Sequence, residues 1–259
     1  MTYIETFFLG LLQGIAEFLP ISSSGHLSLL ESLFHIEEAP LTINIALHAA
    51  TLIVILIFFR KKILSILFPL RKEYVLAIIL TSIPTALLGL SFKLFFKQVF
   101  AMPVLSGFLL LLNGLYLFWV AKLFKTAKET GEEGWEIPNV KQSLIIGIAQ
   151  GIAVLPGLSR SGLTIGISKK LGMNSRSAVE YSLIASLPAI TGAVLLEAKD
   201  MTELNHPEMI LFSAVIAMIS GWLAVKILLK IVDSGSFQYW GMYCIAVGLV
   251  FLGYTYAIQ

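Results

Sequence analysis

The sequence predicts an all-α polytopic membrane protein with six transmembrane helices and two re-entrant helical hairpins, arranged as an inverted-topology repeat. Composition is the first observation behind this fold. Of 259 residues, 57% are hydrophobic and only 13% are charged, and the mean hydropathy is +0.87. A soluble domain carries about 25% charged residues. The other two observations are a set of long apolar runs and a pair of similar apolar segments that are broken in the middle.

Six apolar runs reach the length of about 20 residues that a membrane-spanning helix needs. They cover residues 41–59, 74–94, 102–121, 178–197, 209–231 and 239–258. No cleavable signal peptide is expected, because residues 1–8 hold Glu5 and no basic segment. The single cysteine, Cys244, lies in the last run, so we expect neither a disulfide framework nor a cysteine metal cluster.

Two further segments, residues 10–30 and 147–167, are apolar but interrupted by Pro, Gly and Ser. Shifted by 137 residues, they match at eight positions: Gly10/Gly147, Gln13/Gln150, Gly14/Gly151, Ile15/Ile152, Ala16/Ala153, Ser22/Ser159, Ser24/Ser161 and Gly25/Gly162. Irregular backbone is tolerated at membrane depth only where protein or a water-filled cavity surrounds it. We therefore expect each segment to be a re-entrant hairpin that leaves the membrane on the side from which it entered.

The distribution of Lys and Arg supports this topology. With the N-terminus outside and both hairpins re-entrant, fourteen basic residues lie on the inner side and three on the outer side, as the positive-inside rule requires. The inner loops are residues 60–72, 122–141, 169–176 and 226–236. Each half then holds a hairpin and three spans, so the halves are inverted relative to each other. We expect one membrane domain, with repeats at about 1–125 and 140–259 and a polar linker at 126–139.

The second broken segment has the features of an anion-binding site. Arg160 is the one basic residue deep in an apolar region, and its planar guanidinium suits phosphate oxygens. Gly157 permits a tight turn, and the N-terminus of the helix that follows offers N–H groups to an anion. Three hydroxyl groups add donors: Ser159, Ser161 and Thr164. The alternative is a structural break whose arginine simply pairs with Glu17.

The first broken segment carries groups suited to phosphoryl transfer. Glu17 and His26 flank the break, and folding back would bring them close together. Ionisable residues in an apolar segment are a functional-site hypothesis by default. Phosphoryl transfer needs an anion clamp, an attacking group and a proton carrier. Arg160 can be the clamp, and Ser23 or His26 can attack phosphorus. Glu17 can deprotonate the attacker or hold a divalent metal.

Other polar residues in the spans have weaker assignments. Gln13 lies one helical turn before Glu17, on the same face. Asn44 and His48 share a face of the first span, where they either line the site or form interhelical hydrogen bonds. Asn113 in the third span is expected to hold helices together. The sequence contains no zinc-ligand spacing, P-loop or nucleic-acid-binding patch, so nucleic acid is not an expected partner.

Two motifs resemble a known family. QGIAEFLPISSSGH resembles the first signature of the undecaprenyl-pyrophosphate phosphatases of the bacitracin-resistance type, and PGLSRSGLT resembles the second. ALHAATLIVILIFFR resembles the first span of that family, where His or Gln stands at the position of His48. The resemblance covers nearly the whole chain. It implies hydrolysis of the C55 lipid diphosphate to the monophosphate that carries cell-wall sugars. It also implies a site facing the outer side of the plasma membrane and help from Mg²⁺ or Ca²⁺.

The resemblance also implies roles for individual residues. The catalytic core is Glu17, Ser23, His26 and Arg160. The substrate-binding residues are Gln13, Ser22, Ser24, His48, Gly157, Ser159, Ser161 and Thr164. Gln13 takes a place that is Glu or Gln in the family. Because a neutral amide is a weak metal ligand, Glu17 is the expected one. The family leaves open whether Ser23 or His26 is the nucleophile.

Two other functions stay open. The first is a transporter or flippase for an anionic polyprenyl lipid, because inverted repeats and broken helices are transporter architecture. A carrier needs the anion clamp but not the set formed by Glu17, Ser23 and His26. The second is a structural membrane protein, against which the buried Arg160 argues. The expected partners are the polyprenyl diphosphate and the bilayer. A second copy of the chain, in a homodimer, is a further expected partner, for which no particular residue is assigned.

Overall fold

The structure is a computed structural model that describes residues 1–34, 36, 41–95, 102–130, 136–199 and 206–258. These residues form eleven α-helices and no named strand, which confirms the all-α class. The helices are α1 (Tyr3–Phe18), α2 (Ser23–Leu33), α3 (Leu41–Phe58), α4 (Arg60–Leu67), α5 (Lys72–Phe95), α7 (Pro103–Thr130), α8 (Val140–Ile152), α9 (Arg160–Lys170), α10 (Ser175–Ala198), α11 (Pro207–Ser234) and α12 (Phe237–Ile258).

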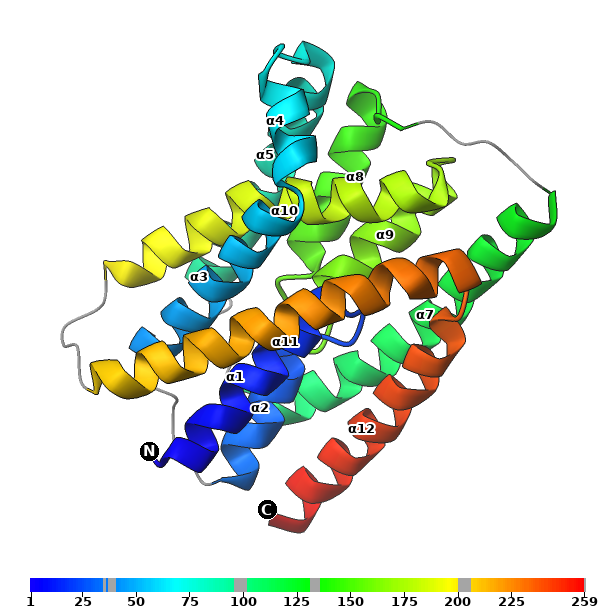
Figure 1. Ribbon diagram of the computed structural model, residues 1–259. Coiled ribbons are helices and arrows are strands. Elements are labelled where there is room, and N and C mark those ends of the chain that lie inside the picture. The colour runs from blue at the N-terminus through cyan, green and yellow to red at the C-terminus, as the bar shows by residue number, and fades with distance from the viewer. Residues whose placement is uncertain (35, 37–40, 96–101, 131–135, 200–205, 259) are drawn as a thin grey trace.

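Six helices in the described ranges are long and apolar enough to cross a membrane: α3, α5, α7, α10, α11 and α12. They coincide with the six apolar runs and confirm that prediction. One of the expected inner loops contains a helix of its own, because α4 occupies most of residues 60–72. The expected linker at 126–139 lies partly outside the described residues. Both termini lie on the same side of the bundle (Figure 1), as an even number of crossings requires.

Each broken segment forms two short helices that lie side by side. The helices have 16 and 11 residues in the first pair (α1, α2), and 13 and 11 in the second (α8, α9). All are shorter than the ~20 residues of a span. The start of each pair lies beside its end: the rings of Phe8 and Phe34 are 6.1 Å apart, and the Gln142 side chain donates to the Leu171 carbonyl at 3.3 Å. Their re-entrant course through a membrane stays a prediction.

Each pair packs against a span from the other half of the chain. The first helix of one pair, α1, lies along α11, and the first helix of the other, α8, lies along α5 (Figure 1). Glycines allow the close approach, since a Cβ atom at Gly14 would overlap the main chain of α11 at Ala217. A Cβ atom at Gly147 would likewise overlap the Thr81 carbonyl of α5. The breaks are thereby held inside the bundle, where Leu19 belongs to the main hydrophobic core.

The helix contacts predict a cost for enlarging one of these glycines. Gly14→Ala places a methyl group against the α11 main chain, which must shift, so we expect a loss of about 1–3 kcal/mol. Gly192→Ala on α10 is the matched control, because nothing lies within 4 Å of a Cβ atom there. Thermal unfolding of the purified variants in detergent measures the difference. Equal unfolding temperatures for the two variants would contradict the packing described for α1 and α11.

Candidate active site

The first break follows from its local sequence. Pro20 has no N–H to donate to a preceding carbonyl, which favours a helix end here, and α1 ends at Phe18. Ser22 then adopts φ 71°, a conformation that is rare outside glycine and that concentrates at functional sites. The hydroxyl of Ser22 accepts a hydrogen bond from the Gly25 N–H at 3.3 Å and caps the start of α2. The break therefore redirects the chain and starts a new helix within four residues.

The second break is built in the same way. Gly157 has φ +101°, and a Cβ atom there would overlap the Ser106 carbonyl of α7, so only glycine suits this turn. Ser159 caps α9 by accepting a hydrogen bond from the Gly162 N–H at 3.2 Å. The two breaks touch, because the Ser161 hydroxyl donates to the Leu19 carbonyl at 3.2 Å. Ser22 and Ser159, which occupy matching positions in the two segments, thus each cap the helix that follows.

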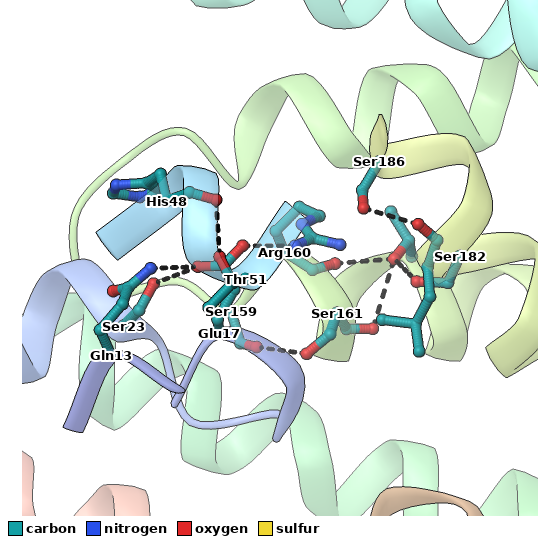
Figure 2. A network of polar contacts seen from close by, with 12 residues as sticks. Gln13, Glu17, Ser23, His48, Thr51, Ser159, Arg160, Ser161, Ser182 and Ser186 are labelled. Carbon is teal, nitrogen blue, oxygen red and sulfur yellow. Dashed lines mark hydrogen bonds and ion pairs between the residues drawn. The ribbon is translucent and has the colours of Figure 1, made fainter. Parts of the chain in front are cut away.

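The Glu17 carboxylate contacts residues from both breaks through an ion pair and hydrogen bonds. The guanidinium of Arg160, the first residue of α9, lies 2.5 Å from Glu17 Oε1 near the end of α1. The other oxygen of Glu17 accepts hydrogen bonds from Ser23 at 2.9 Å and from the Gln13 amide at 3.2 Å. Figure 2 shows these groups pointing toward one another from α1, α2 and α9. Four of the residues implicated by sequence are thus brought together.

The ion pair is deeply buried, with side-chain exposure of 8% for Glu17 and 15% for Arg160. Removing one partner from such a pair leaves an uncompensated charge in a poorly solvated region. Arg160 Nη1 and Gln13 Oε1 are also buried, and neither has a hydrogen-bond partner among the described residues. Unsatisfied buried polar atoms call for an explanation, and an absent ligand is one. The site therefore offers a free N–H donor beside a carboxylate and a hydroxyl.

His26 forms hydrogen bonds with groups other than this carboxylate. Its Nδ1 is 2.8 Å from the Ser22 carbonyl, so this nitrogen carries the proton and donates it. Its Nε2 is 3.0 Å from the hydroxyl of Tyr243 on α12, which therefore donates, and the two rings stack with 6° between their planes. Within the described ranges no hydrogen bond or ion pair joins His26 to Glu17. The group hydrogen-bonded to Glu17 from the start of α2 is Ser23, and the closeness of Glu17 and His26 stays a prediction.

The remaining predicted residues divide by what they contact. His48 of α3 donates from Nδ1 to the Asn44 carbonyl at 2.9 Å, and its main-chain carbonyl accepts from Thr51 at 2.9 Å (Figure 2). Thr164 donates to the Arg160 carbonyl at 2.7 Å and bonds the Ser182 hydroxyl of α10 at 2.5 Å, which anchors α9. The hydroxyls of Ser22, Ser159, Ser161 and Thr164 form hydrogen bonds within the protein, and the Ser24 hydroxyl lies 3.4 Å from that of Ser22. Ser24 is exposed.

Two residues near the site were not assigned to it by sequence. Tyr243 contacts His26 across 217 positions of the chain, and no local pattern marks that pair. Asn113 was expected to hold helices together, and it contacts both breaks. A polar side chain alone in an apolar span was the available signal for Asn113. For Tyr243 the signal is absent, since tyrosines are common at the ends of membrane helices.

The site fits a divalent cation only in part. No group of three His, Cys, Asp or Glu side chains gathers anywhere in the described chain. Among the described side chains at the junction, Glu17 supplies a carboxylate and Gln13 an unpartnered Oε1. Mg²⁺ is commonly held by one or two carboxylates together with substrate phosphates. The residues therefore suit a cation that arrives with a phosphorylated ligand, with Glu17 as its protein carboxylate.

Fold and site together define a polytopic helical membrane protein with an ion-paired carboxylate, a hydroxyl and an anion donor at a buried chain junction. Residues 6–250 match the profile of the family described as bacitracin resistance protein BacA, and the chain belongs to this family. It is 37% identical to the undecaprenyl-diphosphatase of Carboxydothermus hydrogenoformans over 97% of both chains. It is 40% identical to that of Thermosipho africanus over 93% of this chain and 96% of the relative. These matches confirm the family suggested by the two motifs.

The ion pair predicts strong coupling between Glu17 and Arg160 in stability. Glu17→Gln and Arg160→Gln each leave one buried charge without its partner, at a cost of about 3–5 kcal/mol. The double variant removes both charges, so its loss is smaller than the sum by about 1–3 kcal/mol. Unfolding of all four proteins in detergent measures this cycle. Strictly additive losses would mean that the two side chains do not interact.

Proposed function

We propose that this chain is an integral membrane phosphatase that hydrolyses undecaprenyl diphosphate to the monophosphate and inorganic phosphate, and so recycles the lipid carrier of cell-wall synthesis. The observation that carries this proposal is the convergence of Ser23 and Arg160 on Glu17. A nucleophile bonded to a base, with an anion donor beside them, is the arrangement that phosphoryl transfer needs. The curated relatives named undecaprenyl-diphosphatase supply the substrate.

Binding begins at Arg160. Its unpartnered Nη1 and the N–H groups at the start of α9 face the terminal phosphate, whose oxygens can take two parallel hydrogen bonds from a guanidinium. Phosphate oxygens compete with Glu17 for the same guanidinium. When they take it, Glu17 loses its ion-pair partner and keeps the hydrogen bond from Ser23. Substrate binding thereby turns a neutralised carboxylate into a base.

Transfer then proceeds from Ser23. Its oxygen attacks the terminal phosphorus while its proton passes to Glu17, 2.9 Å away. The new O–P bond forms as the bridging P–O bond breaks, and the bridging oxygen leaves with the lipid monophosphate. Water next attacks the phosphoserine. Glu17 returns the proton to the Ser23 oxygen, and dihydrogen phosphate carries away both protons of the water. His26 is the alternative nucleophile, but both its ring nitrogens are engaged, by Ser22 and Tyr243.

A divalent cation, Mg²⁺ or Ca²⁺, completes the proposed site. Glu17 and Gln13 Oε1 would hold it on the protein side, and the substrate phosphates would supply further oxygens. Its contribution would be to neutralise charge on the diphosphate. This role agrees with the small number of protein ligands at the junction.

The proposed setting is the plasma membrane, with the two short-helix pairs re-entering from opposite faces and the site open to the outer side. The exchanged packing of α1 on α11 and α8 on α5 supports an inverted repeat, because exchanging the two halves maps one contact onto the other. The charge distribution supports the orientation. The lipid tail would lie along the spans. A homodimer stays a prediction.

A flippase or transporter explains less of the site. An anion carrier would use Arg160, and it has no need for a hydroxyl hydrogen-bonded to a buried carboxylate. The relatives are named for diphosphatase activity. The enzyme is therefore the function that both the geometry and the comparisons favour.

Phosphate release tests the proposal directly. The purified protein, supplied with a short prenyl diphosphate in detergent with Mg²⁺, should release inorganic phosphate, and EDTA should stop the release. Glu17→Gln and Arg160→Gln should lower the rate at least about 100-fold. Glu180→Gln is the matched control, because Glu180 pairs with Lys62 and Arg176 outside the site. A wild-type protein that binds the lipid without releasing phosphate would favour transport.

The identity of the nucleophile predicts the chemistry of the intermediate. Attack by Ser23 forms a phosphoserine that survives acid, whereas attack by His26 forms a phosphohistidine that acid destroys. We expect an acid-stable label on brief mixing with a substrate that carries ³²P in its terminal phosphate. The label should be absent in Ser23→Ala and present in His26→Ala. An acid-labile label, or one that persists in Ser23→Ala, would assign the attack to His26.

A further inference from the structure

Asn113 bonds to both chain breaks from a helix that belongs to neither of them. It lies in the middle of α7 and is fully buried, with 0% exposure. Its Nδ2 donates to the Pro20 carbonyl in the first break at 2.9 Å. Its Oδ1 accepts from the Ser159 N–H in the second break at 3.0 Å. A third helix therefore ties together two segments that lie more than one hundred residues apart in the chain.

The chemistry of the two breaks explains why an amide stands here. The break at Pro20 presents a carbonyl, which needs a donor, and the break at Ser159 presents an N–H, which needs an acceptor. Both lie in the protein interior, where an unsatisfied backbone group is costly. A primary amide holds a donor and an acceptor on two different atoms of one rigid group. A hydroxyl donates and accepts at a single oxygen, and an ionised carboxylate only accepts. Asparagine therefore satisfies two opposite demands with one side chain.

These two bonds lie next to the reacting groups. Pro20 is three residues after Glu17, and Ser159 immediately precedes Arg160. The Asn113 amide thus sets the distance between the segment that carries the carboxylate and the segment that carries the guanidinium. Resting on the proposed phosphatase function, we propose that Asn113 is a positioning residue that holds Glu17 and Arg160 in reactive register. It touches neither the substrate nor the reacting atoms.

Apart from the pair of Glu17 and Arg160 itself, the other contacts at the junction are weaker or local. Ser161 links the breaks directly through the Leu19 carbonyl at 3.2 Å. Cys244 on α12 lies 3.9 Å from the Pro20 carbonyl and 3.5 Å from Asn113 Nδ2. Thiols form weak hydrogen bonds. Asn113 therefore carries the stronger link from the surrounding bundle to both breaks.

Two substitutions separate the amide's hydrogen bonds from its volume. Asn113→Leu keeps the size and removes both bonds. A misplacement of reacting groups by about 1 Å can cost 100-fold in rate, so we expect kcat to fall about 100-fold with KM changed by much less. Thr255→Val is the matched control, because Thr255 is buried and bonds only to carbonyls of its own helix. That control should keep the wild-type kcat.

Asn113→Asp gives a readout that a purely structural role would not move. A protonated Asp offers the same donor and acceptor as the amide, whereas the ionised form turns a second oxygen toward the Pro20 carbonyl. The ratio of its kcat to that of the wild type should therefore fall as pH rises. Taking the ratio at each pH removes the titrations shared with the wild type, those of Glu17, His26, Tyr243 and Cys244 included. This variant decides the question if Asn113→Leu does not fold.

The outcomes are separable. A wild-type protein that releases no phosphate contradicts the proposed function. An active wild type with Asn113→Leu within about twofold of its kcat contradicts the positioning role alone. A kcat ratio for Asn113→Asp that does not change with pH contradicts it as well. A pH-dependent ratio together with a normal Thr255→Val supports it.

Discussion

The structure depends on one buried ion pair, between a carboxylate from the first half of the chain and a guanidinium from the second. Glu17 and Arg160 lie 2.5 Å apart, and each side chain is at least 85% covered. Neither charge could be buried alone, because an unpaired ion at membrane depth is costly. Both chain breaks must therefore be buried and must meet. The exchanged packing of α1 on α11 and α8 on α5 delivers the two charges to the same place.

The repeat explains how one scaffold came to hold two different reactive groups. In the register that matches Ser22 to Ser159 and Ser24 to Ser161, Ser23 corresponds to Arg160. Each is the first residue of a helix that a serine caps. The proposed nucleophile and the proposed anion clamp thus occupy equivalent positions of the two segments, and both bond to Glu17. The glutamines at matching positions also have different partners. Gln13 donates to Glu17, whereas Gln150 donates to Thr85 on α5.

Hydropathy and motif spacing predicted the six spans and the two broken segments, because these features are local. The pairing of Glu17 with Arg160 was predicted as an alternative, since two opposite charges in apolar segments must find each other. The sequence could not predict the contacts that packing sets. These are the stacking of Tyr243 on His26 and the two hydrogen bonds by which Asn113 contacts both breaks. Ser22 and Ser159 also cap helices, and a serine before a glycine-containing helix start is a readable capping signal.

Charge balance connects the ion pair to the rest of the proposed chemistry. Glu17 and Arg160 together are neutral, and that is why the pair can be buried. A diphosphate adds at least two negative charges to the same confined space, where a low dielectric magnifies repulsion. One guanidinium, already shared with a carboxylate, does not balance them. A divalent cation carried in by the phosphates and held in part by Glu17 would restore neutrality, while the Glu17 oxygen that faces Ser23 would accept the proton. A preformed metal site would instead bury two more charges in the resting protein, and no group of three His, Cys, Asp or Glu side chains gathers in the part of the chain that the structure describes.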